Sequence, residues 1–127
     1  MHDERPVIVD ETTVPLESSA GFGRLEWRTL FSADRTPTTG LTVGVVELSP
    51  TAGRVSRHRH EPAEVYYVLS GHGYVDVDGV VSDLSTGHAI FIPGGVWHCA
   101  WSDTSGGLRL LYAFAVDSFA EVVYEFE

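Results

Sequence analysis

Three histidines and one glutamate stand at positions that can bring them to a single metal ion. His58 and His60 are two residues apart, and in a β-strand this spacing puts both imidazoles on one face and the flanking arginines on the other. Pro62 lacks the N–H that a central strand needs, so we expect it to end this strand and Glu64 to open the next one beside it. His98 follows a Pro-Gly-Gly turn sequence, near the start of a later expected strand.

This donor set is typical of a transition-metal site. Three neutral imidazoles and one carboxylate suit a borderline divalent ion such as Fe, Mn, Co, Ni or Zn, and they leave coordination positions open. Open positions favour catalysis or sensing over a structural role. Taken singly, a His-x-His pair is common in exposed strands, Glu64 is a typical solvated strand end, and His98 is typical of a packed histidine. The four together favour metal binding.

Two tyrosines are candidates for proton transfer beside this ion. Tyr66 lies two residues after Glu64, so its side chain points to the same strand face and starts ~7 Å along the strand. A phenol has a pKa of ~10, and a nearby dication favours the phenolate, so Tyr66 can act as a base near neutral pH. The alternative is an ordinary aromatic residue that fills the barrel. Tyr124 falls in an alternating segment near the C-terminus, and we expect it to face inward.

The elements that must position these side chains are short strands. Apolar stretches are separated by Gly, Pro, Asp and Ser, and the sequence has no sustained helical period and no internal repeat. We predict strands at Leu25–Phe31, Leu41–Leu48, Arg54–His60, Glu64–Ser70, Gly73–Val77, Val80–Asp83, His88–Ile92, Trp97–Trp101 and Leu108–Ala115. The Asp78-Gly79 pair between valine-rich stretches predicts a two-residue hairpin. The pattern indicates an all-β sandwich or small barrel.

Length and composition indicate one folded domain. The chain has 127 residues, of which 43% are hydrophobic and 20% charged, and this composition is too apolar for a disordered protein. No linker divides the sequence. We expect residues 21–127 to form a single barrel domain and residues 1–20 to form an arm that contains one candidate edge strand at Pro6–Val9.

The charge of the chain excludes several classes of function, and its cysteine content indicates the compartment. The net charge of −10 opposes binding to nucleic acids or anionic membranes, and the absence of lysine excludes a Schiff-base lysine mechanism. Cys99 is the single cysteine, the first residues lack the apolar core of a signal peptide, and no apolar run reaches the ~20 residues of a membrane span. We therefore expect a soluble protein in a reducing, cytoplasmic setting.

The spacing of the candidate ligands resembles the two sequence motifs of the cupin family. The residues that match the first motif are Gly53, His58, His60, Glu64 and Gly71, and those that match the second are Gly87, Pro93, Gly95 and His98. Gly53 is one residue closer to the histidines than in the commonest pattern, His88 stands where Asp is frequent, and Ser102 stands where Asn is usual. The resemblance implies a cupin double-stranded β-helix, a small jelly-roll barrel, with a divalent metal on the four ligands and a homodimer as the assembly.

From about Gly23 to Tyr124 the chain is most similar to the small cupin lyases that cleave dimethylsulfoniopropionate. The matching stretches are the region of Trp27 and the segments 40–44, 62–66 and 119–124. The resemblance implies that Tyr66 is the base and that Tyr124 lies in the pocket. The implied reaction is a β-elimination on a small carboxylate bound to the metal, which yields dimethyl sulfide and acrylate. Two alternatives stay open: an Fe(II)-dependent cupin dioxygenase, and a metal-containing cupin that binds or senses a small molecule.

Overall fold

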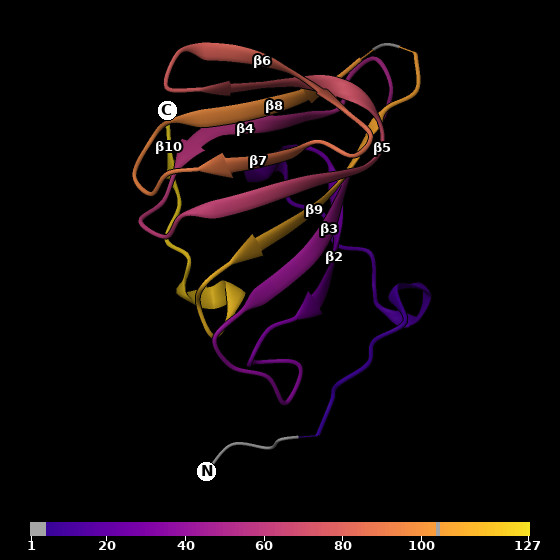
Figure 1. Cartoon of the computed structure of the whole chain (residues 1–127), viewed down its shortest axis with the longest axis vertical. Helices are drawn as coiled ribbons and strands as arrows, with labels where there is room; N and C mark the ends of the chain where they lie inside the picture. The colour runs from indigo at the N-terminus through magenta and orange to yellow at the C-terminus, as the bar shows by residue number, and fades with distance from the viewer. Residues whose placement is uncertain (1–4, 104) are drawn as a thin grey trace.

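The computed structural model describes residues 5–103 and 105–127, and nearly all regular structure in these residues is β-strand (Figure 1). The strands are β1 (Gly23–Arg24), β2 (Glu26–Phe31), β3 (Thr42–Leu48), β4 (Arg54–Arg59), β5 (Glu64–Val77), β6 (Val80–Ser85), β7 (Ala89–Ile92), β8 (His98–Ser102), β9 (Leu108–Phe114) and β10 (Glu125–Phe126). The short 3-10 turns are η1 (Glu11–Thr13), η2 (Ala20–Phe22) and η3 (Phe119–Glu121). None of the described helices is long and apolar enough to cross a membrane. The all-β prediction is confirmed.

The strands pair antiparallel into two sheets that share β5 and form a nearly closed barrel (Figure 1). One sheet has the order β2-β3-β9-β5-β7, and the other contains β4, β8, β5 and β6, with β1 and β10 both paired to β4. The hydrogen-bonded path ends at β1 and β2, which leaves a seam. Aromatic side chains fill this seam, because the ring of Phe22 lies 5.4 Å from that of Trp27 and 6.1 Å from that of Phe119, centroid to centroid.

Alternation along each strand places one row of side chains inside the barrel. In β9 the inward residues Leu108, Leu110, Tyr112 and Phe114 are at most 6% exposed, whereas the residues between them are half-buried. Burial of each large apolar side chain of this kind stabilises the folded chain by roughly 1.5–3 kcal/mol. The interior packing therefore gives the candidate site a rigid frame.

Strand β5 differs from the sequence-based prediction. We expected two strands, Glu64–Ser70 and Gly73–Val77, with a turn between them, but the structure has one continuous strand. Gly71 has a φ of 91°, and a Cβ at this position would collide with the carbonyl oxygen of Gly107. Only glycine accepts both conditions, so the chain bends here without leaving the sheet. The glycines that suggested a turn instead let β5 pass from one sheet to the other.

Two local predictions have different outcomes. The Asp78-Gly79 hairpin is confirmed, because both residues have positive φ, 52° and 87°, and they join the antiparallel strands β5 and β6. The edge strand at Pro6–Val9 is absent. The arm meets the barrel further along, through an isolated antiparallel bridge between Glu17 and Trp27. Pro6 has no N–H to donate to a ladder, which agrees with the absence of pairing there.

Candidate metal centre

A bulge in β4 aims the two neighbouring histidines into the barrel. Val55 pairs with Ala100 and His58 pairs with His98, so Ser56 and Arg57 together oppose a single residue of β8. This extra residue reverses the alternation, and Val55 and His58 both face the interior although they are three positions apart. His60 then follows on the same inner face, as the two-residue spacing predicted.

Glycine contacts fix the second motif against the first. The backbone N–H of Gly95 donates to the carbonyl oxygen of His60 at 2.8 Å. A Cβ on the adjacent Gly94 would collide with the carbonyl oxygen of Glu61, so this turn sits directly on the loop between β4 and β5. The contact brings the start of β8, with His98, beside β4, while Glu64 begins β5 at the end of that loop.

The four predicted ligands converge in the interior. Their exposed fractions are 3% for His58, 4% for His60, 5% for Glu64 and 0% for His98. One donor atom from each of them lies within 4.8 Å of all the others. The imidazole centroids are 4.2 Å apart for His58 and His98 and 5.0 Å apart for His60 and His98. The structure therefore brings together the group that the sequence analysis singled out, and such a group can hold a metal ion.

The imidazoles are oriented by the main chain. His58 Nδ1 donates to the carbonyl oxygen of Ser56 at 2.7 Å, and His60 Nδ1 donates to that of Pro62 at 2.8 Å. His98 Nδ1 donates in the same way to Val96 at 2.9 Å. Because each Nδ1 carries the proton, each Nε2 offers its lone pair to the centre. Within the part of the chain that the structure describes, the buried Nε2 of His98 has no hydrogen-bond partner and lies 3.4 Å from Oε1 of Glu64, as expected for an atom that binds a cation.

The electrostatics of the group favour the form that binds metals. Burial, and after it the charge of His98, lowers the pKa of His58 to about 4, so this imidazole is neutral at pH 7. Burial raises the pKa of the Glu64 carboxyl, but the adjacent His60 and His98 side chains together outweigh burial, so this pKa is lowered from its usual range. A neutral His58 imidazole beside an ionised Glu64 carboxylate is the protonation state that a divalent cation needs.

Both predicted tyrosines lie at a cavity beside this group. Tyr66 is 3% exposed and lines the cavity, as do His58 and Glu64. The ring centroid of Tyr124 is 5.0 Å from that of His58 and 5.3 Å from that of His60. In the protein alone, burial raises the pKa of both phenols well above the usual range. The cavity has a volume of about 60 Å³ and lies directly beside the candidate metal group.

Sequence reasoning missed much of the cavity wall. Phe22 and Phe119, from η2 and η3, line it across the seam, and Trp27 and Tyr112 line it from β2 and β9. The indole Nε1 of Trp27 and the hydroxyl of Tyr112 are buried and find no hydrogen-bond partner among the described residues. Alternation predicts that Trp27 and Tyr112 face inward. Phe22 and Phe119 lie in short 3-10 turns, which carry no periodic signal.

Comparisons with known proteins agree with this architecture. The cupin domain family matches residues 44–114, a stretch that contains all four candidate ligands. The chain is 34% identical over 123 residues to dimethylsulfoniopropionate lyase DddW of Ruegeria pomeroyi. The aligned region covers 95% of this chain and 80% of that protein.

Solved structures give the same fold. The polyketide cyclase RemF from Streptomyces resistomycificus has a TM-score of 0.79 at 23% identity, over 96% of this chain and 85% of that one. A solved structure that is named for the dimethylsulfoniopropionate lyases RdDddP and RnDddQII aligns with a TM-score of 0.74 at 22% identity. The alignment covers 90% of this chain and 62% of that one. The family match and the 34% identical relative together show that the chain belongs to the cupin family.

Proposed function

We propose that this cupin is a metal-dependent carbon–sulfur lyase that converts dimethylsulfoniopropionate to dimethyl sulfide and acrylate. The observation that carries the proposal is the position of Tyr66, which lies in the cavity on the same inner face of β5 as Glu64. The 34% identity to a dimethylsulfoniopropionate lyase over most of the chain supports the same reaction.

The ligand set assigns the cofactor class. We assign His58, His60, Glu64 and His98 as the residues that hold a divalent Fe, Mn, Co, Ni or Zn ion, since their donor atoms converge and are buried. When bound, such an ion supplies a Lewis acid that neutralises the negative charge developing on a carboxylate.

Tyr66 is the proposed base. Its phenolate takes the α-proton of the substrate, the electron pair of that C–H bond forms the new C=C bond, and the C–S bond breaks. Dimethyl sulfide leaves with the C–S electron pair, and the remaining product is acrylate. Burial raises the pKa of Tyr66 in the protein alone, and a neighbouring dication acts in the opposite direction. Tyr124, across the cavity, is the proposed second acid/base group or orienting residue.

The cavity wall fits a substrate with a cationic sulfonium. Six of the eleven lining residues are aromatic: Phe22, Trp27, Tyr66, Tyr112, Phe119 and Tyr124. Aromatic faces attract alkylated cations when water is excluded. Glu64 is the one acidic lining residue, and it belongs to the candidate metal group. The wall therefore offers ring faces to the sulfonium and leaves the carboxylate end of the substrate for the ion.

The test is anaerobic detection of dimethyl sulfide in the headspace above protein loaded separately with each candidate ion. Turnover without oxygen supports elimination, whereas turnover that requires oxygen supports the Fe(II) dioxygenase alternative. Tyr66→Phe is expected to lower kcat by at least ~10²-fold, the usual contribution of a general base, with metal content unchanged. Tyr67→Phe is the matched control, because Tyr67 is 44% exposed on the outer face of β5. If a metal-loaded form binds dimethylsulfoniopropionate but none of the metal-loaded forms releases product, the result supports the alternative of a binding or sensing cupin.

Three further assignments belong to this proposal. We assign the protein to the cytoplasm, as its single buried cysteine suits a reducing compartment. We assign no nucleic-acid partner, because the net charge of −10 repels a polyanion. A homodimer is the proposed assembly, and analytical ultracentrifugation tests it.

A further inference from the structure

The C-terminal segment that carries Tyr124 to the site, residues 124–127, is held by very little main-chain structure. Strand β10 contains two residues, pairs only with β4 among the described strands, and has exposed side chains at both positions. Within this segment the Tyr124 ring stacks on Phe126, with planes inclined by 13° and centroids 5.8 Å apart. Phe126 is itself 44% exposed. A segment this short with so little burial opens easily unless side chains fasten it.

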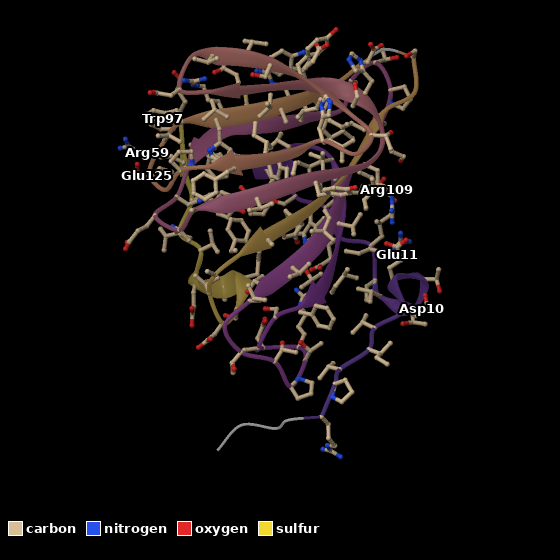
Figure 2. The ribbon with its side chains drawn as sticks, in the orientation of Figure 1. Asp10, Glu11, Arg59, Trp97, Arg109 and Glu125 are labelled. Atoms are coloured by element: carbon tan, nitrogen blue, oxygen red, sulfur yellow. The ribbon has the colours of Figure 1, made fainter. Side chains whose placement is uncertain are left out.

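Arginines on the outer face of β4 fasten this segment. Arg59 forms an ion pair with Glu125, the residue opposite it in the β4–β10 register. The guanidinium carbon of Arg59 also lies 4.6 Å from the ring centroid of Trp97, so the cation stacks on an aromatic face. Figure 2 shows Arg59, Trp97 and Glu125 gathered on one side of the barrel.

Arg57 repeats the arrangement two residues earlier. Its Nε lies 3.0 Å from Oε2 of Glu127, and its Nη1 lies 3.5 Å from Oδ2 of Asp76 on β5. The backbone N–H of Glu127 donates to the carbonyl oxygen of Arg57 at 3.3 Å. The acidic residues of the C-terminal segment thus face the arginines outside, while Tyr124 faces the site inside.

We infer that Arg59, assisted by Arg57, is a positioning residue that holds Tyr124 against the metal group through the ion pair with Glu125. One strand then has two functions: the inner face of β4 supplies His58 and His60, and its outer face fixes the segment that covers them. The inference rests on the proposed function only for the role of Tyr124 in the reaction. The fastening itself is a property of the folded chain.

Hydrogen exchange tests the fastening without any catalytic assay. In Arg59→Gln, the backbone amides of residues 125–127 are expected to exchange about three- to tenfold faster than in the wild type, because an exposed ion pair and a cation–π contact are both lost. Glu125→Gln removes the ion pair from the other side and should give a smaller increase. The charge-swapped variant R59E/E125R should recover most of the protection.

The matched control is Arg109→Gln, which breaks an ion pair with Glu11 on the opposite side of the barrel (Figure 2). It should leave exchange of residues 125–127 within twofold of the wild type. Unchanged exchange in Arg59→Gln, or an equal increase in Arg109→Gln, would overturn the inference.

Kinetics then separate positioning from simple folding effects. We expect Arg59→Gln to lower kcat about three- to tenfold, to leave metal content unchanged, and to be rescued by R59E/E125R. Faster exchange with unaltered kcat would refute a positioning role. If no form of the protein releases dimethyl sulfide, the proposed function fails and the exchange result still decides whether the fastening exists.

Discussion

Acidification of the metal-free protein is expected to destabilise it through His58. In the folded chain, burial and then the charge of His98 lower the pKa of His58 to about 4, compared with 6.5 for the unperturbed side chain. Between these pH values the unfolded chain binds a proton that the folded chain excludes. The stability contributed by the neutral imidazole is fully present above pH 6.5 and is lost as the pH falls.

The size of the effect follows from this shift. The free energy of unfolding falls by at most about 1.4 kcal/mol per pH unit between the two pKa values and by less near each of them, so a fall from pH 6.5 to 4.5 removes about 2 kcal/mol. His58 is 3% exposed, so solvent screening reduces the value little. The range stops at pH 4.5 because the carboxyl of Glu64, whose pKa is also lowered, contributes a further loss below that pH.

Urea unfolding followed by tryptophan fluorescence, in the presence of a chelator, measures this dependence. His58→Gln should lose most of the slope between pH 6.5 and 4.5, whatever its stability at neutral pH. His88→Gln should keep the slope, because His88 is exposed. Equal slopes for the wild type and His58→Gln would refute the argument that burial of this imidazole controls the acid response.

Two further predictions concern the frame of the site and its occupancy. Gly94→Ala should cost about 1–3 kcal/mol of stability and weaken metal binding, since the new Cβ meets the carbonyl oxygen of Glu61. The control for urea unfolding and metal titration is Gly106→Ala, where an added Cβ has no described atom within 4 Å. Ni²⁺ at about 100 times its Kd should raise the free energy of unfolding by about 2.7 kcal/mol in scanning calorimetry. A chelator should reverse this gain and Glu64→Gln should reduce it, and an equal gain in that variant would count against the ligand set.

The sequence predicted the members of the site because their signals are local. The two-residue spacing of His58 and His60 defines a shared strand face, and Pro62 marks the strand end before Glu64. His98 was expected to join the other ligands only through the order of the two motifs, and its pairing with His58 is a finding of the structure. The spacing of residues does not predict the contact between Gly94 and the loop after β4. This contact brings the two motifs together.

The fold prediction is wrong where a glycine conformation or a contact with a residue distant in sequence determines the path of the chain. The sequence pattern predicted a turn near Gly71, but the structure has a bend within β5 there. The close contact of Gly71 with Gly107, far along the chain, determines this path. The covering residues Phe22 and Phe119 also escaped prediction. They are placed by the seam between distant strands, and a short 3-10 turn has no hydrophobic period that reports on such a seam.

The extra residue in β4 has a consequence for any attempt to redesign this protein. A perfectly regular strand cannot present both Val55 and His58 to the interior, since an odd separation sends one of them outward. Straightening this stretch at its present length would therefore force a choice: the chain could keep its apolar packing at residue 55 or its imidazole at residue 58. Removing one bulge residue, such as Ser56, restores an even separation and leaves both side chains facing inward. Engineers who regularise this strand must therefore also shorten it, or they trade stability directly against chemistry although neither residue itself has been changed.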